Sequence, residues 1–261
     1  MIIKNKTILV TGSTGGIGQQ LCKELSDQGA NIILSCYNEE ALKSLQTRLG
    51  PRHSVVTADI GSQQGRDKII TACSEAGGID AVINLAGILE FTLFETQVPN
   101  NIEKIININL TALMMLSQGL LPQLRSKPEA AMVNVGSIFG SIGHPGFTAY
   151  CASKAGVKCF TEALSRELAD TKIHFSYIAP RATQTALNSD QVNALNTALG
   201  NTSDSPAYVA SQIVDVLIHD RAMRFLGWPE KLFVKVNAIF PSLVYRSLAK
   251  QLKTIKQFAI Q

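Results

Sequence analysis

Apolar residues along the chain gather in short runs, and longer amphipathic segments separate these runs. Six of the runs are rich in Val, Ile and Leu and have the length of buried strands: residues 7–10, 31–35, 54–57, 81–85, 131–135 and 174–178. The segments between them space their apolar residues as one face of a helix does. Strands that alternate with helices predict an α/β fold built on a doubly wound parallel sheet.

The composition suits one globular domain, because 46% of the 261 residues are hydrophobic and 17% are charged. Five scattered cysteines lack the C-x-x-C spacing and indicate free thiols in a reducing compartment: Cys22, Cys36, Cys73, Cys151 and Cys159. The four histidines are isolated in sequence, so we predict no metal site. Because the N-terminus leads directly into the first strand, we expect no signal peptide. We also expect a cytoplasmic protein and no nucleic-acid partner.

A glycine-rich segment joins the first strand to the first helix. It reads Thr11-Gly12-Ser13-Thr14-Gly15-Gly16-Ile17-Gly18, with the spacing G-x-x-x-G-x-G. Glycines let a backbone approach a pyrophosphate closely, and the N–H groups of a helix start attract its charge. The order of strand, glycine turn and helix therefore predicts a dinucleotide site. The expected ligands are Thr11, Gly12, Ser13, Thr14, Gly16, Ile17 and Gly18.

Tyr150 and Lys154 lie four residues apart, which places them on one face of a helix. A buried ammonium beside a phenol favours the phenolate, so we expect the pKa of Tyr150 to fall towards neutral. Tyr150 is therefore a candidate proton donor or acceptor. Ser137 lies upstream, at the end of the strand 131–135.

Together these motifs resemble the short-chain dehydrogenase/reductase family over about residues 5–225. Asn84-Leu85-Ala86-Gly87 resembles the family's N-N-A-G segment, with Leu85 in place of the second asparagine. Asn109 matches the family's helix asparagine, and Ser137, Tyr150 and Lys154 complete its catalytic tetrad. The resemblance implies a Rossmann-like fold and an NAD(P)-dependent oxidoreductase of the EC 1.1.1 type, which acts on carbonyl and alcohol groups.

The resemblance also implies a role for each member of the tetrad. Tyr150 gives its proton to the substrate carbonyl oxygen during reduction, and Ser137 hydrogen-bonds that oxygen. Lys154 holds the nicotinamide ribose and lowers the pKa of the tyrosine. Asn109 holds a water molecule that links Lys154 to solvent.

Further cofactor contacts follow from the same resemblance. They are Asp59 and Ile60 after the third strand, Asn84, Ala86 and Gly87 after the fourth, and Pro180, Thr183 and Thr185 in a segment that aligns with the family's P-G-x-x-x-T. Asp59 has a second interpretation as a helix N-cap. Arg181 replaces the glycine of the motif. Two interpretations of this arginine stay open: it can lie at the mouth of the site, or it can face solvent.

The end of the second strand decides between NAD and NADP. Cys36 stands where NAD-dependent members have aspartate, and Tyr37 stands where NADP-dependent members often have arginine. The strand end has no carboxylate that could repel a 2′-phosphate, and Ser35, Tyr37 and Asn38 can donate hydrogen bonds to it. We therefore expect NADP(H) to be favoured over NAD(H), with Tyr37 as a contact. Glu39 and Glu40 would oppose this if they faced the ribose rather than the helix dipole.

The pattern changes after residue 228. A seventh strand at about 224–228 is followed by a segment, 229–261, with six basic residues and one acid, Glu230. Its apolar residues form one stripe before and across Pro241 and another after it: Leu232, Val236, Ile239, Phe240 and Leu243, and then Val244, Leu248, Leu252 and Ile255. We expect a basic amphipathic helix pair, kinked at Pro241 and too interrupted by charge to span a bilayer.

Two interpretations of this extension stay open. The stripes can pack on the domain or on a second subunit and roof the substrate site. Alternatively, the basic face can lie on an anionic membrane surface. We accordingly divide the chain into a dinucleotide-binding and catalytic domain, 1–228, and the extension, 229–261.

The sequence thus predicts an oxidoreductase that transfers a hydride between NADP(H) and a hydrophobic or lipid-like carbonyl or alcohol. We expect a homodimer or homotetramer and a mobile substrate lid over residues 186–205. The alternative is a cofactor-binding sensor or scaffold protein on the same fold without turnover, because fold does not fix function.

Overall fold

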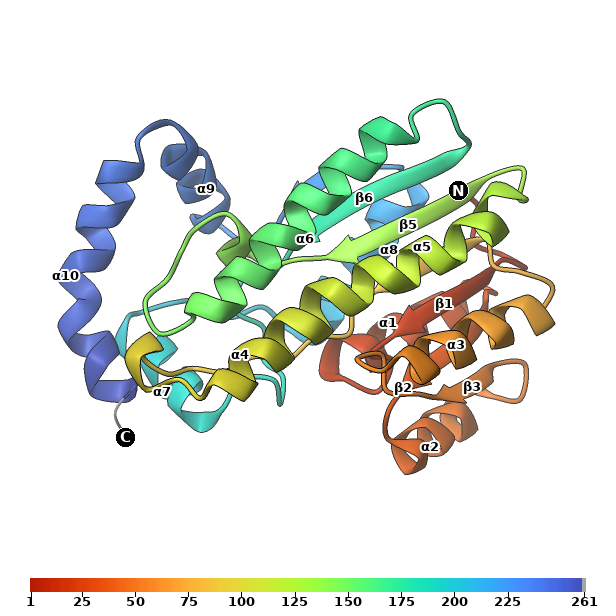
Figure 1. The fold of residues 1–261 in the computed structure, drawn as a ribbon, viewed down its shortest axis with the longest axis horizontal. Coiled ribbons are helices and arrows are strands. Elements are labelled where there is room, and N and C mark those ends of the chain that lie inside the picture. Colours follow the sequence, from red (N-terminus) through yellow and green to blue (C-terminus); the bar gives the residue numbers. More distant parts are fainter. Residues whose placement is uncertain (260–261) are drawn as a thin grey trace.

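A seven-stranded parallel sheet forms the centre of the computed structural model, which describes residues 1–259 (Figure 1). Its strand order is β3-β2-β1-β4-β5-β6-β7. The strands are β1 Thr7–Thr11, β2 Asn31–Cys36, β3 Ser54–Thr57, β4 Ala81–Asn84, β5 Ala130–Val135, β6 Ile173–Ala179 and β7 Met223–Phe225. The doubly wound sheet predicted from the alternating pattern is confirmed, and each of the six predicted runs is a strand.

The chain reverses its direction of winding between β1 and β4. The strands β1 to β3 are laid down towards one edge, and β4 to β7 then build towards the other edge. The carboxyl ends of β1 and β4 therefore adjoin loops that diverge to opposite sides, which opens a crevice suited to a ligand. All strands are parallel, so every strand end with a predicted site residue lies at this one edge.

Helices cover both faces of the sheet and bury its apolar side chains in two separate clusters (Figure 1). One face is covered by α1 Gly16–Asp27, α2 Glu39–Leu49 and α8 Pro206–Ile218. The other face is covered by α3 Gln63–Glu75, α5 Ala112–Arg125 and α6 Thr148–Glu167. Because both faces are buried, the strands are apolar throughout rather than alternating, and β4 and β5 are buried at every position.

The segment Pro99–Arg125 is one continuous run of helix with a local widening in its middle. It consists of α4 Pro99–Ile106, the π-helical turn η2 Asn107–Thr111, and α5. The run is long and apolar enough to cross a membrane, but Leu116, Leu120 and Leu124 are fully buried in the core beneath it. It is therefore a core helix of the fold, and the π turn, a feature frequent at functional sites, carries Asn109.

Beyond β7 the chain forms two helices that stand away from the sheet, α9 Glu230–Ile239 and α10 Pro241–Ala259 (Figure 1). Phe240 separates them, so the predicted kink at Pro241 is a break between helices. The end of α10 lies against α7 Asp190–Ala198, which occupies the predicted substrate lid. Residues 260–261 of the extension lie outside the described part.

The two predicted apolar stripes of the extension have different fates. In the second stripe Ile255 is buried, and Val244 and Leu248 pack against the domain. The first stripe does not pack on the domain, because Leu232, Ile239, Phe240 and Leu243 are exposed, and its packing on a second subunit or on lipid stays a prediction. The reason is the orientation of α9, which turns Val234 instead towards the domain. The division at residue 228 stays a prediction.

Arg181 ties the extension to the domain. Its Nη1 atom lies 3.1 Å from a carboxylate oxygen of Glu230 on α9, and its Nη2 atom lies 2.8 Å from a carboxylate oxygen of Asp204 before α8. The Arg181 side chain is 13% exposed, so it is not the solvent-facing arginine that the sequence left open. The two carboxylates raise the pKa of Arg181 further, and the guanidinium stays charged.

We expect the variant Arg181→Met to lower the free energy of unfolding by about 2 kcal/mol, between the values typical of exposed and of buried ion pairs. The physical reason is that Asp204 and Glu230 would both lose their cation. Urea unfolding of the full chain measures the change. Lys43→Met is the matched control, because it breaks the exposed pair of Lys43 with Glu39 and should change little. Equal effects of the two variants would contradict a structural role for Arg181.

Candidate active site

The glycine-rich segment lies at the carboxyl end of β1 and closes onto the end of β4. Gly12 has a φ of +67°, and a Cβ atom on it would lie 2.9 Å from the Cα atom of Ala86. A Cβ atom on Gly18 would overlap the carbonyl oxygen of Gly12. Any side chain at either position would therefore push the loop away from the sheet, and glycine is required for this close approach.

Side chains of the same segment fix it to the neighbouring strands. The Thr11 hydroxyl accepts hydrogen bonds from the N–H groups of Leu85 and Ala86, at 3.1 and 3.2 Å. The hydroxyl and the N–H group of Ser13 both donate to the carbonyl oxygen of Ser35, each at 3.2 Å. The hydroxyl groups of Thr11 and Ser13 are thus engaged with the protein, and these two residues act mainly by holding the loop in place.

The first turn of α1 offers N–H groups without a competing acid. Its N-cap residue is Gly15, which provides no side-chain cap, and the first turn contains no acidic residue. Such a helix start binds anions, because its unpaired N–H groups and the helix dipole point at the ligand. The loop thus fits the pyrophosphate of a dinucleotide, with Gly16, Ile17 and Gly18 contributing backbone.

The segment that begins at Pro180 is brought to the glycine loop. A Cβ atom on Gly16 would lie 2.7 Å from the Cγ2 atom of Thr185. Pro180 accepts a hydrogen bond from the Ile138 N–H group at 3.0 Å, which ties the segment to the end of β5. Thr183 forms an isolated bridge with Asp204 at the base of the predicted lid. Residues predicted from four separate strand ends therefore meet at one edge of the sheet.

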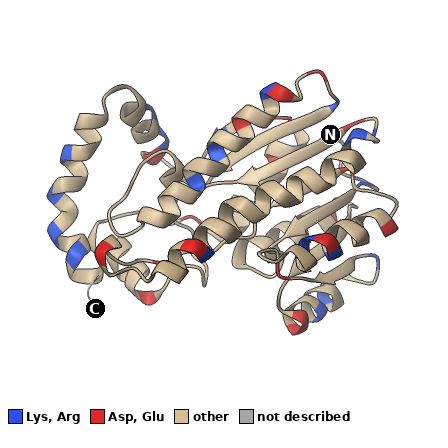
Figure 2. Ribbon diagram, viewed as in Figure 1, with Lys and Arg blue, Asp and Glu red and all other residues tan. Residues whose placement is uncertain are grey.

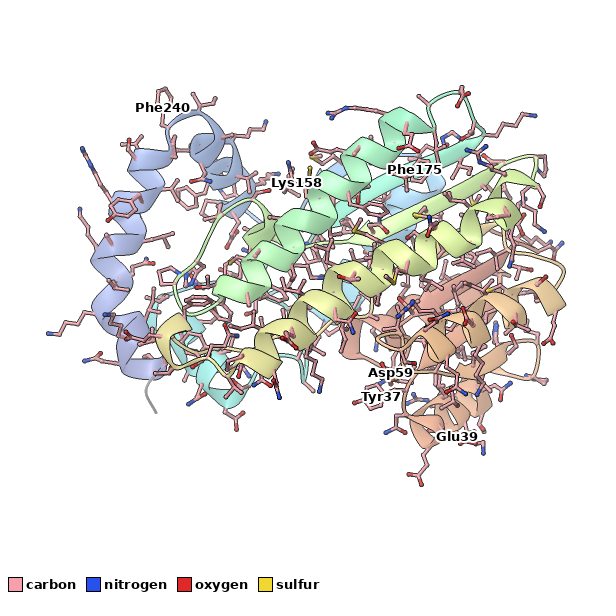
Figure 3. All side chains as sticks on the ribbon, viewed as in Figure 1. Tyr37, Glu39, Asp59, Lys158, Phe175 and Phe240 are labelled. Atoms are coloured by element: carbon pink, nitrogen blue, oxygen red, sulfur yellow. The ribbon has the colours of Figure 1, made fainter. Side chains whose placement is uncertain are left out.

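Tyr37 and Asp59 lie at the far end of this edge, after β2 and β3 (Figure 3). Tyr37 is 77% exposed. Asp59 is not the N-cap of α3, because Ser62 has that role and accepts from the Gly65 N–H group. Instead, Asp59 accepts from the N–H group of Gly61 at 2.9 Å. Ile60, the next residue, is partly buried against the core cluster, and the contact of this pair with adenine stays a prediction.

Ser137, Tyr150 and Lys154 come together between β5 and α6. Lys154 is buried, and its Nζ atom donates to the carbonyl oxygen of Val135 at 3.0 Å. The same atom lies 5.9 Å from the centre of the Tyr150 ring. The Ser137 hydroxyl accepts from the Phe139 N–H group at 3.1 Å, so it also caps the short helix η3 Ile138–Gly140. The structure therefore brings these three residues together in one cluster, and their catalytic roles stay predictions.

The pKa of Tyr150 differs from the sequence-based expectation. Burial raises the pKa of Tyr150 to about 12, and the neighbouring Ser137 hydroxyl offsets only part of the increase. Burial likewise lowers the pKa of Lys154 to about 8. The expected decrease for Tyr150 is wrong for this structure, because Lys154 donates to a backbone carbonyl rather than to the phenol. Tyr150 is thus a protonated phenol at neutral pH, the form that donates a proton.

Asn109 lies on the π turn beside Lys154, and its side chain is fully buried. Its amide donates to the carbonyl oxygen of Ile88 at 2.9 Å and to the Ser153 hydroxyl at 3.1 Å, and it accepts from the Ile88 N–H group at 2.8 Å. A Cβ atom on Gly87 would lie 3.2 Å from Asn109 Oδ1 and 3.5 Å from Lys154 Nζ. The side chain of Asn109 therefore shapes the chamber around Lys154, and its predicted water contact stays a prediction.

The side chain of Asn84 points into the protein. Its amide donates to Asn134 Oδ1 at 2.8 Å, and Asn134 donates in turn to the Thr161 hydroxyl at 2.9 Å. This buried network connects β4, β5 and α6. Asn84 can therefore contribute backbone to a cofactor, whereas its side chain holds the strand ends in register.

Tyr177 on β6 is a site residue that the sequence analysis missed. Its side chain is fully buried, and its hydroxyl donates to the carbonyl oxygen of Ser137 at 3.1 Å. A Cβ atom on Gly136 or Gly140 would collide with the Tyr177 ring. The pairing of a large residue with two glycines from another segment is the signal that could have revealed it. Tyr177 positions the backbone that carries Ser137.

An aromatic cluster adjoins Tyr150 on the side away from the glycine loop. Phe139 lies 6.5 Å from the Tyr150 ring and 5.1 Å from the Phe147 ring, between ring centres. Phe147 in turn stacks on Phe91 at 4.9 Å. Val192 and Leu195 of α7 and Ile255 of α10 complete this cluster. The Tyr150 ring therefore lies among mostly apolar side chains, with His144 stacked on Phe139 at 4.8 Å, and the extension contributes to these surroundings.

The expectation of no metal site stays a prediction. His174 is not isolated in space, because its potential ligand atom and those of Glu129 and Asp220 lie within 4.8 Å of one another. These residues adjoin the amino ends of β5, β6 and β7, at the edge opposite the glycine loop. The cluster is consequently separate from the catalytic residues.

Comparison with known proteins places this site in a family. The family model described as short chain dehydrogenase matches residues 6–196. The chain is 31% identical over 241 residues to 3-oxoacyl-[acyl-carrier-protein] reductase FabG of Vibrio harveyi, covering 90% of this chain and 94% of that protein. It is 32% identical over 195 residues to Nodulation protein G of Rhizobium meliloti, covering 73% of this chain and 78% of that protein.

Two solved structures share the fold. A short chain dehydrogenase from Burkholderia cenocepacia in complex with NADP superimposes with a TM-score of 0.82 at 21% identity, covering 95% of this chain and 99% of the other. A 3-ketoacyl-(acyl-carrier-protein) reductase from Brucella melitensis complexed with NADH superimposes with a TM-score of 0.79 at 22% identity, covering 85% of this chain and 96% of the other. These two structures show the fold, and the family model and the relatives show that the chain belongs to the short-chain dehydrogenase/reductase family and is an NAD(P)-dependent oxidoreductase.

Proposed function

We propose that the protein reduces a hydrophobic carbonyl compound to an alcohol with NADPH. The observation that carries the proposal is the protonated phenol of Tyr150 beneath an apolar aromatic cluster. A phenol whose pKa lies above neutral keeps its proton at neutral pH, and it can give that proton to a carbonyl oxygen on which negative charge develops. Apolar walls bind an alkyl or aromatic substrate and leave the carbonyl oxygen to the few polar groups present.

The proposed reaction assigns one task to each residue. The bound nicotinamide supplies the hydride to the carbonyl carbon. The Tyr150 hydroxyl donates its proton to the carbonyl oxygen as negative charge develops there, and the Ser137 hydroxyl hydrogen-bonds the same oxygen. Lys154, as an ammonium group 5.9 Å from the centre of the Tyr150 ring, holds the ribose, and its charge offsets only part of the cost of the phenolate that remains on Tyr150. Asn109 and Gly87 lie beside Lys154, along the route by which a proton returns to Tyr150.

Four contacts support NADP(H) as the preferred cofactor. The residue at the end of β2 is Cys36 rather than a carboxylate, and its sulfur accepts a hydrogen bond from the Thr14 hydroxyl at 2.9 Å. Glu39 pairs with Lys43 at 2.6 Å along α2, which directs its charge away from the strand end (Figure 3). Asn38 caps α2, which leaves the exposed Tyr37 as the available donor. Lys68, which the sequence analysis did not single out, donates to the Thr57 carbonyl at 2.9 Å and adds a cation near a 2′-phosphate.

The assembly and location that we propose follow the sequence. A homodimer or homotetramer would cover Met114 and Met115, which are exposed on α5. A cytoplasmic location suits the five free thiols. The catalytic unit would be 1–228, with the extension 229–261 attached through Arg181.

Tyr150→Phe should reduce turnover by on the order of 100-fold or more, because it removes the proton donor and keeps the ring. The oxidation of NADPH in the presence of an aliphatic ketone or aldehyde measures the loss. Cofactor binding should persist in a fluorescence titration. Tyr208→Phe makes the same chemical change on an exposed tyrosine and should leave turnover unchanged. Near-full turnover by Tyr150→Phe would refute the assigned proton donor.

The reduction should weaken above about pH 8. Burial disfavours the charged form of Lys154, so its pKa lies at about 8 and its ammonium form is lost above that pH. Tyr150, with a pKa of about 12, stays protonated across this range. The pH profile of kcat/KM for NADPH tests this, because it reports groups of the free enzyme. A profile that stays level to about pH 10, the ordinary range of lysine, would contradict the assignment.

Cys36→Asp should shift the preference towards NADH, because a carboxylate there repels a 2′-phosphate and accepts from a ribose hydroxyl. The wild-type protein should bind NADPH more tightly than NADH, and fluorescence titration of both cofactors measures the ratio. Cys159→Asp, on the exposed side of α6, is the control and should keep the wild-type ratio. A wild-type preference for NADH would overturn the cofactor assignment.

A further inference from the structure

The junction of α9 and α10 carries a concentrated group of exposed apolar side chains. Ile239, Phe240 and Leu243 are 68%, 57% and 54% exposed. Of the 16 large hydrophobic residues exposed in the described chain, seven lie within residues 228–245. We name the following residues the apical cluster: Leu232, Phe233, Ile239, Phe240, Leu243 and Tyr245. Figure 3 shows Phe240 at the turn between α9 and α10, at the upper tip of the extension.

Packing on the domain does not account for the apical cluster, because another side of the extension already makes that contact. Val234 is buried among Ile138, Val157 and Tyr177. Asn237 donates to the Ser141 carbonyl oxygen at 2.9 Å. Farther along, Ile255 is buried near α7. The extension therefore has two apolar sides, whereas a helix pair that only roofs the domain needs one.

The charge around the apical cluster is of one sign (Figure 2). The extension has six exposed basic residues: Lys231, Lys235, Arg246, Lys250, Lys253 and Lys256. Its single acid, Glu230, is paired with Arg181. Among residues 1–259 no ion pair engages any of the six basic side chains of the extension. An apolar group at the start of a helix whose length carries cations that no ion pair engages is complementary to an anionic surface with an apolar interior (Figure 2).

This charge also argues against a second copy of the chain as the occupant. A two-fold interface places the same patch of both subunits face to face. Here it would set cation against cation, which disfavours association. A spanning arrangement is equally unsuitable, because the basic residues recur along α10 and interrupt its apolar surface. Contact parallel to a membrane surface satisfies both the charges and the apolar side chains.

We propose that the apical cluster docks this protein onto an anionic lipid surface. Ile239, Phe240 and Leu243 insert below the headgroups, and the flanking basic residues contact the anionic phosphates. Trp228 before α9 and Tyr245 on α10 are exposed at the two ends of residues 228–245, and such amphipathic aromatic side chains are stable at a membrane interface. Docking goes beyond the proposed reduction and does not depend on it.

Co-sedimentation of the full chain with vesicles tests the proposal. We expect binding to vesicles of equal phosphatidylcholine and phosphatidylglycerol at about 20 mM salt, and release at about 500 mM salt, where screening is much stronger. Binding to pure phosphatidylcholine should be weak. Trp228 is the only tryptophan of the chain and is exposed, so its emission should shift to shorter wavelength on binding.

Matched variants locate the contact. Phe240→Ser should weaken partitioning about tenfold, whereas Phe94→Ser, at a similarly exposed phenylalanine outside the extension, should not. Lys253→Glu should weaken it at least fivefold, and Lys172→Glu on the domain should not. These positions are exposed, so all four variants should keep the wild-type Tm.

Several results would overturn the proposal. One is the absence of co-sedimentation of the wild-type protein with anionic vesicles. Another is binding of Phe240→Ser to these vesicles that equals the binding of the wild type. Equal binding to neutral and anionic vesicles would contradict the claim that the lipid surface must be anionic. Self-association without vesicles that Phe240→Ser abolishes would identify an interface between copies instead.

Discussion

The buried ammonium group of Lys154 is the constraint on which the catalytic site depends. A cation removed from water is costly unless hydrogen bonds stabilise it, and among the described residues its partner is the carbonyl oxygen of Val135. The end of β5, the glycine at position 87 and the π turn that carries Asn109 all lie around this group. The same burial that lowers the pKa of Lys154 raises the pKa of Tyr150, so the two groups are set as charged amine and neutral phenol below about pH 8.

The parallel sheet makes this arrangement possible. Every strand delivers its carboxyl end to one edge, so residues distant in sequence meet without long loops. The Thr11 hydroxyl links the ends of β1 and β4, and the network from Asn84 through Asn134 to Thr161 links β4, β5 and α6. The glycine loop and the catalytic residues therefore share one rigid frame. The segment that begins at Pro180 joins the frame through the Ile138 N–H group, and Arg181 extends the frame to α9.

Sequence reasoning found what short-range spacing determines. The glycine loop between strand and helix, the four-residue step from Tyr150 to Lys154, and the alternation that defines the sheet are all local patterns. They hold because strand ends and helix faces fix the positions of such residues. The helix break at Phe240 also followed from a local signal, the proline after it.

The features that sequence reasoning missed depend on contacts between distant segments. The pKa of Tyr150 rises because the fold buries it and directs Lys154 elsewhere, which no spacing reveals. Tyr177 supports Ser137 only because two glycines from another segment make room for its ring. Arg181 pairs with Asp204 and Glu230, 23 and 49 positions along the chain. The exposed side of α9 likewise depends on which of its faces the domain receives.

Transfer of hydride from the cofactor to a carbonyl carbon is the central claim, and isotope labelling tests it most directly. NADPH carrying deuterium at both C4 positions would be incubated with the protein and a series of aliphatic and aromatic ketones and aldehydes. The claim predicts an alcohol with one deuterium on its carbinol carbon, detected by mass spectrometry, and faster reaction with the more apolar carbonyls. No alcohol from any member of the series, or an alcohol without deuterium, would contradict it.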